Sequence, residues 1–435
     1  MEFKNRKHEL NVINDILNSN KFEFLIIYGR RRIGKTELIL NATKNKKSLY
    51  YFSVGENNLE RFYSLCNNFD NNTKKLKKDY EILIDYLKNE IEVLIIDEFQ
   101  NLIKEDKNIL NLFQYIIDSK LKNSKFKLIL LGSSVSMISS KVLSYQSPLY
   151  GRKTYSMKLN SINFFDLKLF YPKKNIKELI EIYGFADGIP YYLIKIDKPF
   201  WKFIQSELIE KQFLKDEVDF IMKYEFEDSS TYKLILEAIA NGKNKLNEIK
   251  DFMKVARTDL SPYLRNLIDV DLIKREVPIT ENINSRQGRY FIKDNFLKFW
   301  FKYIYPNQSL IEQRAFNIDL IKKNYNNYLG NVFEEICKQY LIKNKIIQFN
   351  KIGRWWHKED EIDIVAFNDK EILFCECKYK ENVNPLEILK KLEEKSKKIE
   401  HNKNQIFVIF AKSFSKIISK YNEKKVYCFD LKKFV

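Results

Sequence analysis

The segment that constrains the fold most is FEFLIIYGRRRIGKTELIL, residues 22–40, where an apolar run leads into a glycine-containing loop and then an amphipathic stretch. This pattern predicts a buried strand, a loop and a helix. Its glycines would let backbone N–H groups surround phosphate oxygens, Lys35 would reach the β- and γ-phosphates, and Thr36 would offer a hydroxyl to Mg²⁺. The segment therefore predicts ATP and Mg²⁺ as cofactors. The loop matches G-x-x-x-x-G-K-[ST] and consists of Gly29, Arg30, Arg31, Arg32, Ile33, Gly34, Lys35 and Thr36.

A second apolar run, IEVLIIDEFQNL at residues 91–102, has the length of a strand and leads into Asp97 and Glu98. An acid at that strand end can hold Mg²⁺ through water, and the next acid can polarise the water that attacks the phosphate. Acids after an apolar strand are common, so this segment alone is weak evidence. Its position about 60 residues after the phosphate loop makes the pair a strong indication of a nucleotide-hydrolysing site.

Further strands are predicted at 48–54 (SLYYFSV), 126–137 (FKLILLGSSVSM) and 154–159 (TYSMKL). Helical segments separate them, which favours a parallel, doubly wound sheet with the site at the carboxyl ends of the strands. Ser133 follows one of these strands and would sense the γ-phosphate between the loop and the acids. A plain strand-to-turn junction is the alternative for this serine.

The middle of the chain changes pattern at Thr231. Helices are predicted at 231–242, 246–253 and 256–273, followed by two extended segments, which is the order of a winged helix-turn-helix. The third helix would present side chains to a DNA groove, although winged helices in ATPases also pack against neighbouring domains. Those side chains are Arg257, Thr258, Ser261, Tyr263 and Arg265.

The C-terminal quarter combines a predicted helix at 328–342 with a strand pair, IGRWWHKEDEIDIVAFN and EILFCECKYK. Strand alternation puts Glu376 and Lys378 on one face and the two cysteines, Cys375 and Cys377, on the other. A zinc site would need a second Cys/His pair at ligand spacing, and the sequence has none, so the cysteines are interpreted as buried apolar residues.

The acids of this region have a chemistry in common. Asp363 and Glu376 are hard oxygen ligands that would hold Mg²⁺ against a scissile phosphate, and Lys378 would orient or help deprotonate the attacking water. Glu334, on the helix, would complete the acidic cluster. A helix Glu, a strand Asp and then Glu-x-Lys is the order of the PD-(D/E)xK phosphodiesterase fold, so the domain would cleave DNA or, alternatively, only bind it. Trp355 and Trp356 would stack on a base or pack under the sheet.

The N-terminal set resembles the P-loop ATPases of the AAA+/STAND group, which carry an extra strand beside the phosphate loop and a catalytic glutamate. The opening FKNRKHELNVINDIL (3–17) is similar to the N-terminal box of that group, and the arginine run in the loop is typical of the archaeal ATPase family. SPLYGRKTYSMKL (147–159) and GFADGIPYYL (184–193) also resemble that family. The resemblance implies a helical lid, a C-terminal domain of the kind just described, and Arg152 as a trans-acting finger, with a solvated arginine as the alternative.

Composition limits the remaining choices. The chain has 435 residues, enough for several domains, and a net charge of +18, which indicates a polyanionic partner such as DNA or merely reflects an AT-rich genome. It lacks an apolar run long enough for a membrane span, has a charged N-terminus, and contains 5 scattered cysteines, so a cytoplasmic protein without membrane partners is expected.

The predicted fold is an α/β P-loop NTPase with a parallel sheet and a helical lid, then a winged helix, then a small α/β nuclease-like domain. The predicted function is a Mg²⁺-dependent ATPase that acts on DNA, with metal-dependent cleavage in the C-terminal domain and self-association through the ATPase domain. The alternative is an ATP-dependent switch of the STAND type, whose later domains only bind nucleic acid or protein. The predicted domains are 1–160 for the ATPase core, 161–228 for the lid, 229–300 for the winged helix, 301–328 for a linker and 329–435 for the nuclease-like domain.

Overall fold

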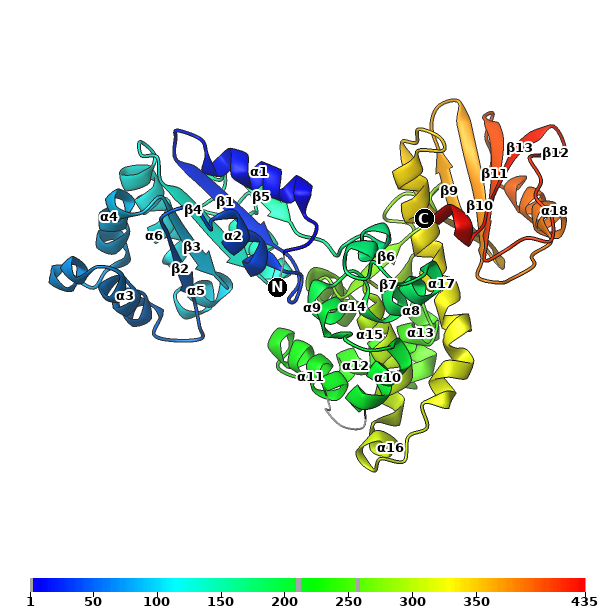
Figure 1. The fold of residues 1–435 in the computed structure, drawn as a ribbon, viewed down its shortest axis with the longest axis horizontal. Helices are drawn as coiled ribbons and strands as arrows, with labels where there is room; N and C mark the ends of the chain where they lie inside the picture. Colours follow the sequence, from blue (N-terminus) through cyan, green and yellow to red (C-terminus); the bar gives the residue numbers. More distant parts are fainter. Residues whose placement is uncertain (1–2, 209–212, 256–258, 435) are drawn as a thin grey trace. The chain divides into compact units, whose positions relative to one another are not determined.

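The computed structural model describes residues 3–208, 213–255 and 259–434 (Figure 1). The chain forms two compact units. The first unit contains the chain up to Ser161 together with 189–192 and 269–271, and the second contains 162–188, 193–268 and the chain from Leu272 onward. In the described ranges, the chain forms no helix that is both long and apolar enough to cross a membrane.

The first unit is built on a parallel sheet whose five strands, among the described residues, have the order β2-β3-β4-β1-β5. The three central strands β3, β4 and β1 are near-continuous apolar runs that are buried on both faces, as expected for a parallel sheet covered by helices. β4 lies between β1 and β3, which confirms the predicted extra strand. The strands are β1 (Glu23–Tyr28), β2 (Ser48–Phe52), β3 (Val93–Asp97), β4 (Lys127–Gly132) and β5 (Tyr155–Lys158).

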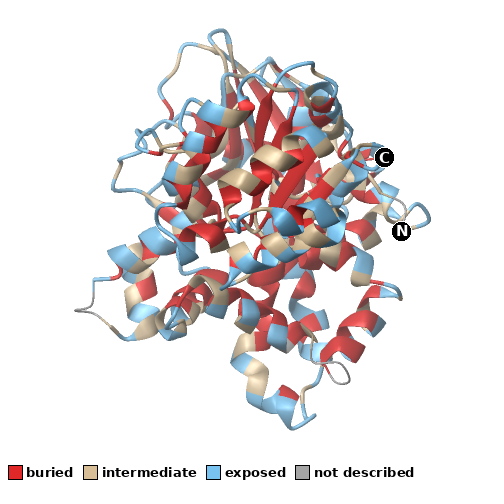
Figure 2. Ribbon diagram, turned by 90° about the vertical axis from the view of Figure 1, so that its left-hand side faces the viewer, coloured by how far each residue is buried: buried red, intermediate tan, exposed pale blue. Residues whose placement is uncertain are grey.

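Alternate strand residues of the first unit point into one large core. Phe24, Leu94 and Leu128 belong to this core with Phe62 and Phe113 from the covering helices. Each fully buried phenylalanine contributes roughly 1.5–3 kcal/mol to folding. Figure 2 shows sheet strands in red, the colour of buried residues. The helices are α1 (Lys7–Leu17), α2 (Lys35–Ala42), α3 (Asn58–Phe69), α4 (Tyr80–Glu90), α5 (Gln100–Glu105), α6 (Ile109–Ile116) and α7 (Val135–Met137).

Of the helices after β5, α8 to α11 lie in the predicted lid, α15 lies at the end of the predicted winged helix, and α16 lies in the predicted linker. Trp300 is fully buried in this part, and Phe185 contacts the rings of Phe296 and Phe299 edge to face. These helices are α8 (Ile176–Ala186), α9 (Pro190–Lys195), α10 (Phe200–Ser206), α11 (Phe213–Glu225), α15 (Asn295–Phe299) and α16 (Gln308–Glu312).

The middle segment has the predicted element order of helices followed by a hairpin. Its helices are α12 (Ser230–Ala240), α13 (Leu246–Met253) and α14 (Ser261–Asp269), and the antiparallel strands β6 (Ile273–Glu276) and β7 (Arg289–Ile292) follow. We call β6, β7 and the connecting residues 277–288 the wing hairpin. Arg257 and Thr258, predicted to face a DNA groove, lie outside the described residues. Ser261 and Tyr263 are on α14, and so is Arg265.

The C-terminal part is a sheet with a helix on each face. Among the described residues its strands have the order β12-β13-β11-β10-β9-β8. Leu389 and Leu392 of one helix pack on Phe374 and Phe407, whereas Phe333 of the other helix contacts Tyr379. The elements are α17 (Asp319–Asn344), β8 (Lys351–His357), β9 (Asp360–Phe367), β10 (Glu371–Lys378), α18 (Pro385–Ser396), β11 (Asn404–Ala411), β12 (Lys420–Tyr421) and β13 (Lys424–Phe429).

α17 is longer than the helix predicted at 328–342. It begins at Asp319 and runs through the position of the predicted boundary between 328 and 329. The reason is that Ile321 and Tyr325 are buried at helical spacing ahead of Tyr328, the first residue of the predicted helix. Tyr325 and Tyr328 donate hydrogen bonds to main-chain oxygens of α8, at 2.7 Å each, which ties the first half of the helix to the lid region.

Candidate functional site

The phosphate loop lies between the end of β1 and the start of α2. A Cβ at Gly29 would meet the main-chain oxygen of Leu159 at 2.5 Å, and Gly34 has a φ of 89°, so both positions need glycine. The Lys35 ammonium donates to the main-chain oxygens of Gly29 at 2.8 Å and Arg30 at 3.0 Å. Burial lowers the pKa of Lys35 to about 8, against the opposing effect of Glu98 and Asp97. The ammonium therefore lies inside the loop that was predicted to hold phosphates.

Thr36 and Asp97, predicted to act on the same Mg²⁺, lie in direct contact. The Thr36 hydroxyl donates to Asp97 Oδ2 at 2.6 Å, and the Glu98 main-chain N–H donates to Asp97 Oδ1 at 2.8 Å. Hydroxyl and carboxylate oxygens are hard ligands, and Mg²⁺ bound with ATP commonly keeps several waters, so this pair fits the ion. The Tyr50 hydroxyl also donates to Asp97 Oδ2, at 2.8 Å. Burial and the Asp97 charge raise the pKa of Tyr50, so it stays a neutral donor.

Glu98 and Ser133 are also brought together. Ser133 follows β4, the strand next to β3, and its hydroxyl donates to Glu98 Oε2. The Gln100 side-chain amide donates to the same Glu98 oxygen and to Ser133 Oγ, the latter at 3.2 Å. Glu98 has a φ of 54°, which a non-glycine residue adopts at some cost and which is found at functional sites. Sequence reasoning missed Gln100, because its contact with Ser133 depends on β4 lying beside β3, which no local pattern specifies.

Arg6, from the N-terminal box, and Arg32, from the phosphate loop, both have defined partners. Arg6 donates to the main-chain oxygens of Asn160 at 2.6 Å and Ile33 at 3.4 Å, which braces the loop. The Arg32 guanidinium lies 3.9 Å from the centre of the Tyr191 ring. A cation over an aromatic face is attractive. Tyr191, which belongs to the first unit, therefore contacts the loop.

Arg152 lies away from the phosphate loop of its own chain. The neighbouring Thr154 bonds Phe24 at the opposite end of β1 from the loop. Arg152 forms a two-pronged ion pair with Asp118, with Nε–Oδ1 at 2.9 Å and Nη2–Oδ2 at 2.7 Å. Arg152 is therefore a partly exposed residue that is paired with Asp118 of the same chain.

In the C-terminal part, Asp363, Glu376 and Lys378 lie on neighbouring strands. The Lys378 ammonium is 2.6 Å from Glu376 Oε1, and the Cys377 main-chain N–H donates to Asp363 Oδ2 at 2.7 Å. Lys395 of α18 lies 3.6 Å from Glu376 Oε2. Burial, together with the charges of Glu334 and Glu376, raises the pKa of Asp363.

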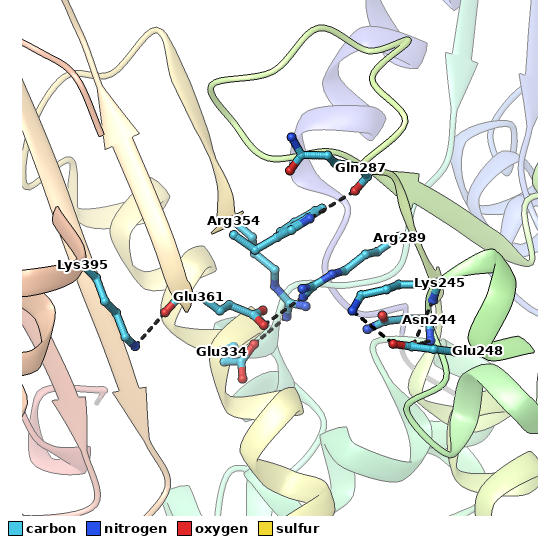
Figure 3. Close-up of polar contacts among 10 residues, drawn as sticks. Asn244, Lys245, Glu248, Gln287, Arg289, Glu334, Arg354, Glu361 and Lys395 are labelled. Atoms are coloured by element: carbon cyan, nitrogen blue, oxygen red, sulfur yellow. Dashed lines mark hydrogen bonds and ion pairs between the residues drawn. The ribbon is translucent and has the colours of Figure 1, made fainter. Parts of the chain in front are cut away.

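Glu334 has a different partner from the one predicted. Arg354 of β8 donates to its carboxylate at 2.6 Å, as Figure 3 shows. Burial raises the pKa of Glu334 to about 7, with Arg354 opposing the shift. Across the described ranges, no three His, Cys, Asp or Glu side chains gather in an arrangement that could hold a metal ion. Asp363 and Glu376 remain as a two-carboxylate pair, with Glu334 neutralised by a cation.

The cysteines behave as the alternation predicted. Cys375 and Cys377 are buried on the face of β10 that packs toward α17, with their sulfurs 3.8 Å apart, and Ile372 and Phe374 join the core on the α18 face. The strand QIFVIFA at 405–411 pairs with β10 in parallel.

The wing hairpin is joined to the edge strand β8. Arg289 forms an ion pair with Glu361 at 2.9 Å and lies over the Trp356 ring at 4.5 Å, and the Trp356 indole donates to the main-chain oxygen of Gln287 at 3.1 Å (Figure 3). The Ile279 main-chain N–H donates to the main-chain oxygen of Arg354 at 2.9 Å. Trp355 is buried in the core of the sheet. Both tryptophans are therefore packed within the protein and do not present a face for a base.

Comparisons with known proteins identify the family of the ATPase domain. Residues 3–196 match the family described as an ATPase domain predominantly from Archaea. Residues 300–399 match a family described as archaeal and bacterial proteins of unknown function. An uncharacterized protein of Methanocaldococcus jannaschii is 52% identical over 387 residues, which cover 87% of this chain and 88% of the relative. An uncharacterized ATP-binding protein of the same organism is 51% identical over 45 residues, or 10% of this chain and 76% of the relative.

Among solved structures, a Walker-type ATPase of Pyrococcus abyssi is similar with a TM-score of 0.53 and 22% identity. The alignment covers 69% of this chain and 96% of that protein, so the two share their fold over most of the solved structure. The Methanocaldococcus relative is similar over nearly the whole length of both chains. The chain therefore belongs to the archaeal ATPase family, whose domain is an ATP-binding P-loop ATPase.

Proposed function

We propose that the chain hydrolyses ATP in a Mg²⁺-dependent reaction at the phosphate loop and uses the cycle to act on DNA. The observation that carries the first part is the meeting of Thr36, Asp97, Glu98 and Ser133 at the carboxyl ends of β1, β3 and β4. Ligands of doubly wound sheets bind at these strand ends.

Each of these side chains has a separate task in hydrolysis. Gly29 to Gly34 and the Lys35 ammonium would bind the phosphate oxygens, with Lys35 exchanging main-chain oxygens for phosphate. Thr36 and Asp97 would hold Mg²⁺, the aspartate through water, and the ion would neutralise charge that develops on the β- and γ-phosphate oxygens. Glu98 would orient the attacking water and accept its proton. Ser133 would leave Glu98 to contact the γ-phosphate.

The test is the variant Glu98→Gln. It keeps the shape of the side chain and removes the base, so we expect ATP turnover to fall by about 100-fold or more while ATP affinity is retained. The matched control is Glu56→Gln, because Glu56 is an exposed acid in the loop after β2. Turnover by Glu98→Gln at the rate of the unchanged protein would exclude Glu98 as the base.

DNA is proposed as the partner because the chain carries a net charge of +18. Binding of duplex and single-stranded DNA should weaken steeply as salt rises, since counterions are released when basic side chains contact phosphates. Absence of measurable binding at low salt would favour the alternative, a STAND-type switch that acts on protein. Such a switch would self-associate through its ATPase domain when ATP is bound.

Metal-dependent DNA cleavage is a second proposed activity, and one feature of the acids favours it. Among the described residues, buried Glu376 Oε2 has no hydrogen-bond partner and lies 3.6 Å from the Lys395 ammonium. Burial raises the pKa of the Asp363 carboxyl, and repulsion from Glu334 and from the buried Glu376 raises it further. A divalent cation would relieve this repulsion, and the donor set of two carboxylates fits Mg²⁺ or Mn²⁺. Lys378 would then orient the attacking water.

The test is a cleavage assay on single-stranded, duplex and branched DNA with Mg²⁺ or Mn²⁺. We expect Lys378→Ala and Glu376→Gln to lose cleavage and keep DNA binding. Lys380→Ala is the control, because Lys380 is exposed two residues further along the same segment. No cutting by the unchanged protein under these conditions would leave the domain as a binder.

A further inference from the structure

Two adjacent tyrosines on β2 point to opposite faces of the sheet and form hydrogen bonds with different residues. Tyr50 donates its hydroxyl hydrogen bond to Asp97 Oδ2 at 2.8 Å, whereas the Tyr51 hydroxyl contacts Asn58 at 2.9 Å and 2.7 Å. Alternation along a strand explains the split. β2 is the strand next to β3, so Tyr50 reaches Asp97 from a neighbouring strand and bonds the same carboxylate oxygen as Thr36 of the loop.

Both oxygens of the Asp97 carboxylate accept hydrogen bonds. Thr36 and Tyr50 share Oδ2, and the Glu98 main-chain N–H holds Oδ1. In the proposed function, the Thr36 hydroxyl would coordinate Mg²⁺ and would give up its hydrogen bond to Asp97. Tyr50 and the Glu98 N–H would then be the groups left to fix the carboxylate. A phenol hydroxyl in such a place donates its hydrogen and orients the acceptor, which is how outer groups tune a metal ligand.

We propose that Tyr50 is a positioning residue for the Mg²⁺–ATP site, which holds Asp97 in the orientation that receives the hydrated ion. The proposal rests on the proposed function of Asp97. Tyr50 itself touches neither nucleotide nor metal in this scheme. Its effect therefore belongs to the dependence of nucleotide binding on Mg²⁺ and not to nucleotide binding as such.

The experiment compares Tyr50→Phe with Tyr51→Phe, which remove one hydroxyl each from neighbouring positions of the same strand. The affinity for the slowly hydrolysed analogue AMP-PNP is measured by calorimetry in EDTA and across a series of Mg²⁺ concentrations. Mg²⁺ increases the affinity for AMP-PNP, and the measured quantity is the Mg²⁺ concentration that gives half of this increase. We expect this concentration to be about tenfold higher in Tyr50→Phe than in the unchanged protein. In EDTA its affinity should equal that of the unchanged protein.

Tyr51→Phe should leave the Mg²⁺ dependence unchanged, because its hydroxyl bonds Asn58 on the other face. ATP turnover adds a second readout: excess Mg²⁺ should restore the turnover of Tyr50→Phe, which a defect of folding would not allow. In the background of Asp97→Asn, adding Tyr50→Phe should have no further effect on Mg²⁺ dependence.

The outcomes separate the two proposals. A normal Mg²⁺ dependence in Tyr50→Phe, or an equal shift in Tyr51→Phe, would overturn the role of Tyr50 and leave the ATPase site intact. If the unchanged protein binds AMP-PNP with no dependence on Mg²⁺, the proposed metal site and the Tyr50 inference both fail.

Discussion

The phosphate-loop site of the first unit and the carboxylate cluster of the second unit differ in the partners of their charged groups. Lys35 donates to main-chain oxygens, and Asp97 accepts from hydroxyls and a main-chain N–H. Glu334 and Glu376 instead contact the charged side chains of Arg354 and Lys378, at 2.6 Å each. A hydrogen bond between a charged and a neutral group is worth roughly 1.5–3 kcal/mol net, whereas removing one partner of a buried ion pair costs about 3–5 kcal/mol. The first site is therefore prepared for charged ligands, and the second must give up internal pairs to bind one.

The largest effect is expected from Lys35→Ala, which tests whether the phosphate-loop site binds ATP. Losing the ammonium removes charge-assisted bonds to phosphate, so we expect ATP affinity to fall by about 100-fold or more. Calorimetric titration with ATP measures the change. Lys44→Ala is the matched control, since Lys44 is an exposed lysine just after α2. Unchanged ATP affinity in Lys35→Ala would refute the assignment of the loop.

The counterpart in the second unit is Arg354→Met. It leaves Glu334 buried without its cation, and we expect the second unit to lose roughly 3 kcal/mol of unfolding free energy. Tryptophan fluorescence during urea unfolding reports this unit alone, because the 4 tryptophans of the chain are Trp201, Trp300, Trp355 and Trp356, all in the second unit. The double variant with Glu334→Leu should recover much of the loss. If Arg354→Met and the unchanged protein unfold alike, the pair is not a stabilising contact.

The pH dependence of the second unit should follow Glu334. Its pKa is raised from 4.5 to about 7 in the folded state, so between these values the folded chain binds more protons than the unfolded chain. The unfolding free energy attributable to this group therefore falls as pH rises from 4.5 through about 7 and is constant above. Glu334→Gln should flatten that slope in fluorescence-detected unfolding at pH 5, 6, 7 and 8. Equal slopes in the two proteins would contradict the shift.

The smallest expected effect belongs to Arg152. Its ion pair with Asp118 is partly exposed, so Arg152→Ala should change the free energy of unfolding by about 0.5 kcal/mol or less. If a neighbouring subunit uses this arginine, ATP turnover per chain rises with protein concentration in the unchanged protein and not in Arg152→Ala. Asp118→Asn is the control, since it breaks the same pair and keeps the arginine. Concentration-independent turnover in all three proteins would count against a trans-acting role.

The sequence allowed the first unit to be predicted in detail because each of its signals is local. Buried parallel strands are continuous apolar runs; Asp97 and Glu98 stand at the end of one, and Lys35 and Thr36 follow another after a short glycine-containing loop. Tyr50 could not be found this way, because its role depends on β2 lying beside β3, which no local pattern specifies. Gln100 was equally hidden, since its contact with Ser133 depends on β4 lying next to β3.

The second unit was harder to predict, because its contacts are distant in sequence. The pairing of Glu334 with Arg354 brings a helix to an edge strand, and that of Arg289 with Glu361 joins residues 72 positions apart. Asp363 and Glu376 lie on the paired strands β9 and β10, as the order of the acids predicted, and their role as metal ligands stays a prediction. The cations that face them became visible only with the sheet order.

The contact of the wing hairpin with β8 has a consequence for how the chain avoids aggregation. β8 is the last strand of the C-terminal sheet, and an uncovered edge strand offers unpaired N–H and C=O groups to any other strand. The Ile279 N–H of the hairpin donates to the Arg354 oxygen at this edge, and the Trp356 indole of β8 donates to the main-chain oxygen of Gln287. We expect a C-terminal fragment lacking residues 273–292 to expose β8 and to aggregate through edge-to-edge strand pairing, which the hairpin hinders in the full chain.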